Sequence, residues 1–447
     1  MQETHKVTHA KRRITVNVQK IAKKYLLGIA TAYMCYLTHG VQALIFSQNK
    51  VNFYLQWGFT DETAGAAAVS MAIMWIGVGK FLSVWLGGEL SDRIGRKIPA
   101  VAGGVLYIIS FVIMLIATDP FVAFVAGFLS GLATSGFWDG AFYPAVQEAT
   151  PRYAPSAVIG IKGVISVAGI IYPLFVAMNS GDSWQINIWI PIVMSVICVV
   201  LAVFTPFVYD DKRKVKVGDT EKTTAGKNEA EVEIQAAQDA MLAKPNALVQ
   251  FFTLFYGFVC MFIMYGAQQY TKAFGLTNAG LDDVAAAGLT SIYTAGSIIA
   301  VLFWAFMMGK VRWNPIKVIL IDSIFTAVAL AIVLLFQQVV VIYIAIALLG
   351  FFAAGGALQT GVSVRQNVVP GPKGRNIGMY YTFMGAGSVF LPFIVGSMTT
   401  AIGEAQAVYL MMALLLAASL IAIVMTSYII SQHKKMFGYS AMKKLPD

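Results

Sequence analysis

The sequence predicts an all-α integral membrane protein whose twelve transmembrane helices form two pseudo-symmetric six-helix halves. The prediction depends on three observations: the composition, the number of long apolar segments, and the placement of the basic residues. Of the 447 residues, 58% are hydrophobic and only 12% are charged, whereas about 25% of the residues in soluble domains are charged. So many apolar side chains cannot all be hidden from water in a soluble fold. A soluble enzyme, a disordered chain and a nucleic-acid-binding protein are therefore excluded, despite the net charge of +10.

Twelve apolar segments are long enough to cross a membrane as helices, which takes roughly 20 residues each. They do not alternate between apolar and polar residues as the strands of a membrane β-barrel do. The first segment lacks a small-residue cleavage pattern, so it is interpreted as a span and not as a signal peptide. The predicted spans are 25–49, 63–87, 98–117, 120–147, 156–178, 187–209, 246–271, 284–308, 316–336, 339–364, 376–400 and 404–431.

The basic residues predict the orientation of the spans. All but four of the 32 Lys and Arg residues fall in the terminal segments or in loops that follow even-numbered spans. Lys50 and Lys272 lie on the other side, and Lys80 and Lys162 lie within spans. Cytoplasmic loops of membrane proteins carry such an excess of Lys and Arg. We therefore expect a multi-pass protein of the cell membrane with both termini in the cytoplasm.

A change in composition divides the chain in two. Residues 210–245 are rich in Lys, Asp, Glu, Ala and Gln, which is typical of a solvated linker. The predicted organisation is a cytoplasmic segment 1–24, a first half 25–209, the linker 210–245, a second half 246–431 and a cytoplasmic tail 432–447. Short matches relate the halves, such as Gln147–Pro151 with Gln366–Pro370 and Gly40–Gln42 with Gly266–Gln268. A duplicated six-span unit is typical of transporters in which two halves rock around a central site.

The loop between spans two and three carries a recognisable motif, Gly88-Glu89-Leu90-Ser91-Asp92-Arg93-Ile94-Gly95-Arg96-Lys97. It resembles the G-x-L-x-D-R-x-G-R-K signature of the major facilitator superfamily, and the resemblance covers essentially the whole chain. The resemblance implies that this cluster, including Arg93 and Arg96, closes the cytoplasmic face in the outward-open state. We expect Gly88 to permit close helix approach, Asp92 to pair with a cation or a helix N-terminus across the half, and Gly95 to allow a tight turn. The alternative is a basic loop that only sets orientation.

Ionisable residues within the spans are candidate functional residues, because charge is costly at that depth. Asp139 in span four is followed by Pro144 five residues later, an arrangement similar to that in organic anion:proton symporters of the superfamily. In those symporters the matching acid couples transport to protons, so the resemblance implies the same role for Asp139. The alternative is a static ion pair with Lys80 or Lys162. Two buried lysines against one acid would also attract an anionic substrate group, although Lys162 is close enough to the loop to reach it.

Other polar residues within the spans have less certain roles. His39 could titrate or contact substrate, or it could simply be a hydrogen-bonded structural residue. Asp322 in span nine is expected to form a structural pair with Lys317 or Lys310. The Gln268-Gln269 pair resembles the paired glutamines of sugar porters in span seven. Candidate lining residues, which could instead hold helices together, are Gln42, Gln268, Gln269 and Tyr380.

The sequence shows no P-loop, no metal-spaced His/Cys set and no nucleophile-elbow serine, so we expect neither an enzyme nor an ATP-driven pump, and no cofactor or metal. The three cysteines, Cys35, Cys198 and Cys260, are expected to be buried without disulfides. The prediction is a monomeric transporter that moves a small organic anion, a carboxylate or sugar acid, together with protons. Neutral sugar:proton symport, drug or metabolite efflux, and a non-transporting sensor are the alternatives.

Overall fold

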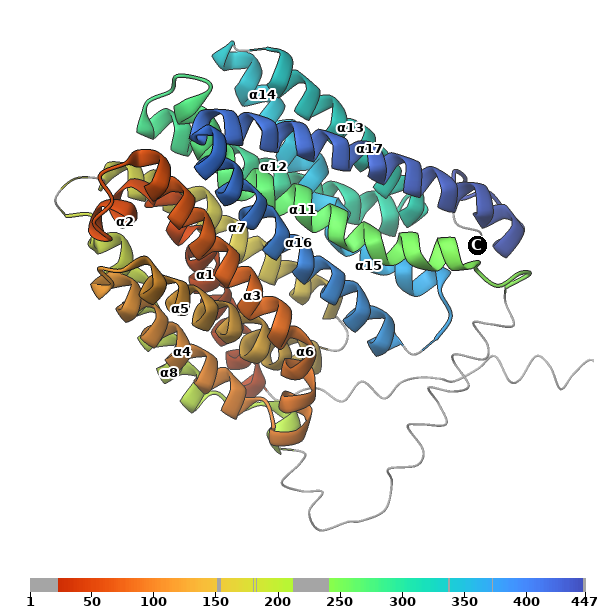
Figure 1. Ribbon diagram of the computed structural model, residues 1–447. Helices are drawn as coiled ribbons and strands as arrows, with labels where there is room; N and C mark the ends of the chain where they lie inside the picture. Colours follow the sequence, from red (N-terminus) through yellow and green to blue (C-terminus); the bar gives the residue numbers. More distant parts are fainter. Residues whose placement is uncertain are drawn as a thin grey trace, which may run out of the picture.

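The computed structural model describes residues 23–150, 154–179, 181, 183–211, 241–336, 338–371 and 373–444. Within them, twelve helical segments are long and apolar enough to cross a membrane, as predicted (Figure 1). Most predicted boundaries agree within a few residues, but the seventh span continues to Thr277, so Lys272 lies within it. The predicted segment 1–24 and the linker 210–245 fall largely outside the described residues.

The first six spans are long helices, and in the described residues one of them, span four, is interrupted by a π-helical turn. A polar cap begins several helices: Asp61 accepts a hydrogen bond from the backbone of Thr63, and Asp119 does so from Phe121 just after Pro120. Span four is α-helical at both ends and π-helical in the middle. The elements are η1 (Lys23–Tyr25), α1 (Leu26–Gln48), α2 (Lys50–Gln56), α3 (Glu62–Ile94), α4 (Lys97–Ile116), α5 (Pro120–Gly131), η2 (Leu132–Trp138), α6 (Asp139–Ala149), α7 (Ala154–Met178) and α8 (Ile186–Phe204).

The last six spans repeat this plan, including the π-helical interruption in their fourth helix. Asn246, Asp282 and Asn314 cap the starts of three of these helices. The elements are α11 (Ala247–Thr277), α12 (Asp283–Gly309), α13 (Pro315–Leu335), α14 (Val339–Leu349), η4 (Gly350–Gly356), α15 (Ala357–Val368), α16 (Lys373–Ile402) and α17 (Glu404–Phe437). Because π-helical turns occur often at functional sites, η2 and η4 single out spans four and ten.

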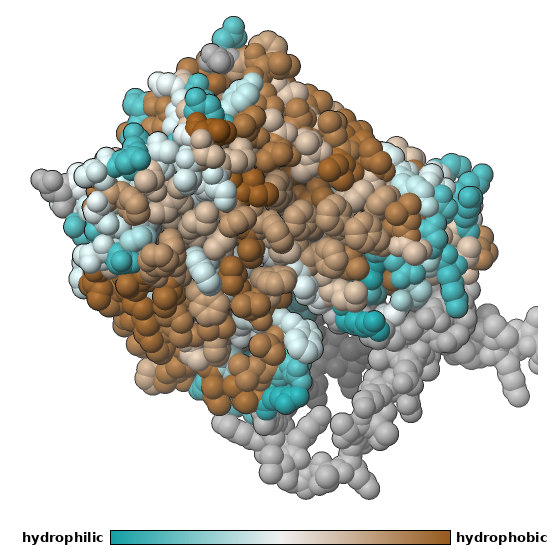
Figure 2. Space-filling model, viewed as in Figure 1, coloured by the Kyte–Doolittle hydropathy of each residue, from teal (hydrophilic) through white to brown (hydrophobic). Residues whose placement is uncertain are grey.

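The outer surface of the helices is apolar along their length. Figure 2 shows brown, hydrophobic side chains over the middle of the molecule and teal, hydrophilic ones gathered toward its ends. Large apolar side chains on this surface are well exposed, among them Trp85, Phe121, Phe204 and Leu302. A soluble protein would bury such residues, whereas lipid tails cover them in a membrane.

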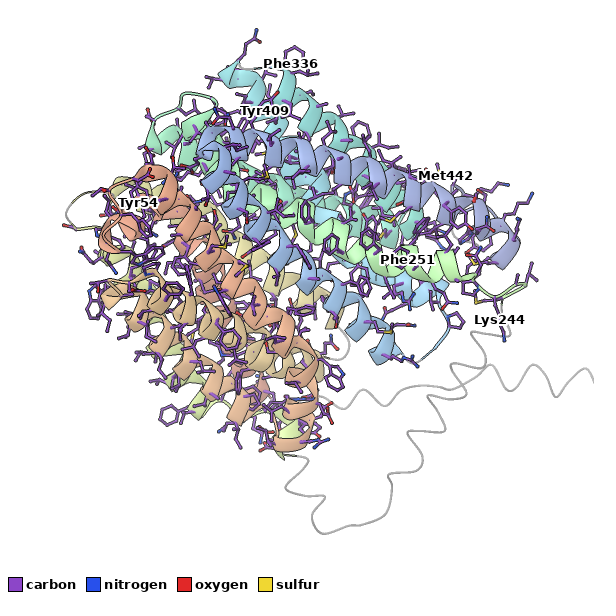
Figure 3. The ribbon with its side chains drawn as sticks, viewed as in Figure 1. Tyr54, Lys244, Phe251, Phe336, Tyr409 and Met442 are labelled. Atoms are coloured by element: carbon purple, nitrogen blue, oxygen red, sulfur yellow. The ribbon has the colours of Figure 1, made fainter. Side chains whose placement is uncertain are left out.

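The two ends of the molecule can be told apart by the residues they carry. Lys244 and Met442 lie at one end (Figure 3), where Figure 1 also marks the C-terminus, and we call this end the terminal face. Tyr54 and Phe336 lie at the other end, which we call the opposite face (Figure 3).

The first six and the last six spans form two groups that meet along α3 with α16 and α7 with α12 (Figure 1). At Gly77 a side chain would come within 2.5 Å of the Ser388 backbone oxygen, so α3 and α16 approach closely. Hydrogen bonds between the two groups lie toward the opposite face. There Gln269 Nε2 donates to the Ala43 carbonyl, and Ser291 Oγ donates to the Ile170 carbonyl. Among the described residues, no hydrogen bond joins the groups near the terminal face. The protein is thus closed at the opposite face.

Candidate functional site

Asp139 is the first residue of α6 and directly follows the π-helical turn η2. Tyr36 Oη on α1 donates a hydrogen bond of 2.8 Å to Asp139 Oδ1. Ser135 Oγ, one turn earlier on the same span, donates one of 3.0 Å to Oδ2. Two hydrogen-bond donors from two spans therefore hold the carboxyl group in a defined position, while its side chain stays only half-buried.

Lys80 on α3 faces this acid without binding it. Its ammonium group interacts electrostatically with Asp139 and with His39. Within the described structure the Lys80 ammonium group has no hydrogen bond, and it is in none of the ion pairs with an N···O distance of 4.0 Å or less. Lys80 is therefore not held in a tight ion pair with Asp139, which leaves its ammonium protons available to another group.

His39 on α1 links Lys80 to Lys162 on α7. Its Nδ1 lies 3.0 Å from Tyr107 Oη, and both lysines are within electrostatic range of the ring. The side chains of His39 and Lys162 are only half-buried, although both positions lie well inside spans. We call His39, Lys80, Asp139 and Lys162 the central cluster. The structure brings together all four of these predicted residues.

Tyrosines complete the surroundings of Asp139. Tyr143 lies one helical turn after the acid, and Tyr381 reaches it from α16 in the last six spans; each interacts electrostatically with Asp139. The spacing of four residues from Asp139 to Ser135 and to Tyr143 is a signal that sequence reasoning missed, because such residues share a helix face. Nothing in the sequence pattern connects Tyr36 to Asp139, since that contact joins two different spans.

The predicted lining residues have different surroundings. Gln42 and Gln269 are buried, with Gln42 Nε2 donating to Ser130 Oγ at 2.9 Å and Gln269 Nε2 to the Ala43 carbonyl at 2.7 Å. Both therefore hold helices together. Tyr380 is also fully buried, packed against Gly361 and Gly257. Gln268 alone among the four is half-buried.

The motif between spans two and three forms a compact cluster of charges at the terminal face. Arg96 donates to Asp92 Oδ1 at 2.7 Å and to Glu148 Oε1 at 2.9 Å, and its guanidinium lies over the Tyr209 ring at 4.3 Å. Burial acts to lower the pKa of Arg96, but the hydrogen bonds and charges of Glu148 and Asp92 outweigh burial and raise that pKa. Asp92 thus pairs with a cation, but that cation is Arg96, four residues later, and not a group across the half. Arg93 pairs with Glu89.

Of the two glycines of this motif, Gly88 differs from the expectation and Gly95 agrees with it. A side chain at Gly88 would meet no atom within 4 Å, so Gly88 does not provide the close helix approach. That role belongs to Gly87, where a side chain would come within 2.4 Å of the Ser135 backbone oxygen, because the two helices already touch there. Gly95 does make the tight turn, with φ of +96°. Asp210 then accepts hydrogen bonds from the backbone N–H groups of Arg96 and Lys97 and caps α4.

The predicted structural pair of Asp322 is wrong. Lys317 lies over the Trp313 ring at 3.8 Å, and Lys310 lies near the Phe306 ring at 5.7 Å. Asp322 instead points into the interior of the last six spans, where only 1% of the residue is exposed. Lys317 and Asp322 are five residues apart on α13, so they face different sides of that helix. Lys310 lies at the end of α12, beside Phe306.

The three cysteines, Cys35, Cys198 and Cys260, are free and buried, as predicted. Their burial within spans matches their apolar sequence context.

Comparison with known proteins agrees with this architecture. The family model described as Major Facilitator Superfamily matches residues 37–321 and 278–437. The chain belongs to the Major Facilitator Superfamily. It is 28% identical over 374 residues to the Escherichia coli inner membrane transport protein YdiM, covering 82% of this chain and 86% of YdiM. It is 27% identical over 375 residues to the uncharacterized MFS-type transporter YfkL of Bacillus subtilis, covering 84% of this chain and 89% of YfkL.

Solved structures of superfamily members share the fold. The chain is similar to a D-xylose-proton symporter, with a TM-score of 0.67 and 13% identity over 94% of this chain and all of that one. The nucleoside transporter NupG gives a TM-score of 0.65 and 14% identity, over 92% of this chain and all of that one. At these identities the likeness shows the fold only. As a superfamily member the protein is a membrane transporter and not an enzyme.

Proposed function

We propose that this superfamily transporter is a proton-coupled symporter of a small organic anion, a carboxylate or a sugar acid, which it moves by alternating access. One observation carries the proposal: Asp139 is held by Tyr36 and Ser135, while Lys80 faces it without an ion-pair partner in the described structure. An acid positioned by donors can take up and release a proton. A cation without a tight partner at this depth can bind an anion.

The two lysines of the central cluster favour an anion over a neutral solute. Lys80 and Lys162 both act on His39, so two positive groups converge where Asp139 provides one negative group. A carboxylate between the lysines would balance that charge, and protonation of Asp139 would strengthen the local positive field. Proton and anion binding would then favour each other, which is the requirement for symport. Gln268 on α11 is the glutamine whose side chain is accessible enough to contact the solute.

The hydrogen bonds and the ion pair that close the opposite face favour an inward-open state, once the terminal face is placed in the cytoplasm. We propose that orientation, in a cell membrane, from the Lys and Arg residues in the loops of that face. For transport, the bonds at the opposite face would have to break and the motif around Asp92 and Arg96 would have to meet the last six spans. Gating by Asp92, Arg93, Gly95 and Arg96 is therefore part of the proposal.

The coupling residue can be tested in proteoliposomes with an imposed inward proton gradient. Organic acids and the corresponding neutral sugars are first screened by thermal shift, and the best stabiliser is used as labelled solute. Asp139→Asn should abolish gradient-driven accumulation and keep exchange of labelled for unlabelled solute. Glu62→Gln, an exposed acid at the opposite face, is the control and should accumulate normally. Gradient-driven accumulation by Asp139→Asn at the normal rate would show that the coupling assignment is wrong.

The anion site needs a separate experiment. Lys80→Ala and Lys80→Gln should lose the thermal shift given by the best organic acid, by at least tenfold in apparent affinity, because the positive charge is removed in both. Lys310→Gln, a lysine at the terminal face, should keep it. If only neutral sugars stabilise the protein, and Lys80 variants bind them unchanged, neutral sugar:proton symport is the better assignment.

A further inference from the structure

A second acid, Asp322 on α13, is buried without any ion-pair partner in the described structure. Only 1% of the residue is exposed, and neither carboxyl oxygen has a hydrogen-bond partner among the described residues. The two nearby lysines in sequence lie over aromatic rings elsewhere. An ionised carboxylate left uncompensated in an apolar interior would be very costly, so a bound proton or a bound cation must neutralise it.

The carboxyl group lines a small cavity of about 20 Å³ between the last six spans. That volume is enough for about one water molecule. Four polar groups line it besides Asp322, two from α11 and two from α13: Tyr256, Cys260, Ser323 and Thr326. The other lining residues, from α11, η4, α15 and α17, are apolar: Ile263, Phe352, Ala353, Ala357 and Ala422.

Trp304 on α12 completes the surroundings of the acid. Its Nε1 and Asp322 Oδ2 each lie 2.8 Å from the point where a side chain at Gly356 would begin. The glycine therefore leaves room for an indole N–H and a carboxyl oxygen to lie near each other. Trp304 Nε1 is buried and has no other hydrogen-bond partner.

The groups facing Asp322 favour a proton over a cation. The titratable ones are Tyr256 and Cys260 of α11, and no charged residue other than Asp322 lines the cavity. Ser323 Oγ donates to the Ile319 carbonyl at 2.7 Å, so its proton is not available to an ionised carboxylate. A protonated carboxyl is neutral, whereas a metal cation would need more oxygen ligands than this largely apolar cavity contains.

We propose that Asp322 is a second proton-binding site, in the last six spans, that takes up and releases its proton through water in this cavity. Its burial without an ion-pair partner and the water-sized cavity beside it carry the proposal. In the exchange a hydronium ion passes one proton to the carboxylate and is left as water; on release the carboxyl group returns that proton to a water molecule. The inference extends the proposed proton coupling, but it concerns a different residue and is tested without a transported solute.

The test uses infrared difference spectroscopy of the purified full-length transporter in nanodiscs, titrated from acidic to alkaline buffer. The C=O stretch reports a protonated carboxyl group. Wild-type protein should show a carboxyl band that Asp322→Asn removes, that Asp322→Glu shifts in frequency, and that Asp139→Asn retains. The band should also shift in D₂O, because the proton exchanges with water. A band that fails to shift in D₂O would contradict exchange of the Asp322 proton with water.

Two further outcomes would overturn the proposal. If Asp322→Asn and Asp322→Glu both leave the spectrum unchanged, Asp322 carries no proton. If replacing choline by Na⁺ removes the Asp322 band, the site binds a cation instead. Should Asp322→Asn fail to fold, the frequency shift of Asp322→Glu and the Na⁺ comparison still decide the matter. Loss of the Asp322 band leaves the Asp139 assignment untouched, so the two proposals fail independently.

Discussion

Lys50 on α2 forms an ion pair with Glu404 at the start of α17, which joins the first six spans to the last six at the opposite face. The side chains are only 12% and 10% exposed, so water and salt screen the pair weakly. Close by, Lys272 on α11 donates to the Gln48 carbonyl at 3.1 Å. The two lysines that fall outside the basic loops and the central cluster thus both bridge the groups of spans at the closed face.

Breaking the Lys50–Glu404 pair should open the opposite face. We expect Lys50→Gln to widen the distance between spin labels at Thr118 and Gln406, which lie at that face on the first and last six spans, as measured by pulsed electron paramagnetic resonance. Lys50→Glu combined with Glu404→Lys should restore the short distance by re-forming the pair. A single substitution that leaves the distance distribution unchanged would show that packing alone keeps this face closed.

Lys272 should contribute to the stability of the closed form. Its ammonium bonds the Gln48 carbonyl and pairs with Asp283 at 2.9 Å, while the side chain is almost fully buried. Lys272→Met should lower thermal stability by about 1–3 kcal/mol, because the Gln48 carbonyl and the acid lose their partner. Differential scanning fluorimetry in detergent measures the effect, with Lys310→Met as the exposed control. Equal melting temperatures for the two variants would contradict this role.

The two acids that bind Arg96 should differ in importance. Asp92 is 65% exposed, whereas Glu148 is 25% exposed and anchors the guanidinium between α3, α4 and α6. Glu148→Gln should destabilise the protein by about 1–3 kcal/mol, since it removes a charge-assisted acceptor from a buried cation. Asp92→Asn should cost only about 0–1 kcal/mol, as exposed ion pairs do. Thermal unfolding of both variants measures the two losses of stability. A larger loss for Asp92→Asn than for Glu148→Gln would show that Asp92 is the more important partner of Arg96.

Gly350 should be intolerant of a side chain. It begins the π-helical turn η4, and an added Cβ would come within 1.9 Å of the Tyr293 backbone oxygen. Gly350→Ala should therefore force α12 and η4 apart and cost about 1–3 kcal/mol. Gly163→Ala is the matched control, because a side chain there would meet nothing within 4 Å. Comparable melting temperatures for the two alanine variants would show that the α12–η4 contact relaxes freely.

Much of the fold could be predicted because lipid imposes a simple rule on the chain. A spanning helix must be long and apolar, so the twelve spans are visible as twelve apolar runs. The seventh span was predicted too short because Lys272 suggests a loop, whereas its ammonium finds the Gln48 carbonyl inside the protein. Similarly, the motif assigns close helix approach to Gly88, whereas Gly87 makes it, because a sequence motif records which residues occur and not which way each residue faces.

The sequence by itself determined the fold class, the number of spans and the short list of buried ionisable residues, because each follows from the local cost of placing a residue in hydrocarbon. Only the tertiary structure decided the partners of those residues. Tyr36 meets Asp139 across two spans, Lys80 faces the acid without binding it, and Asp322 turns away from its neighbouring lysines. Such contacts depend on how helices rotate and cross, and packing between distant segments sets those angles.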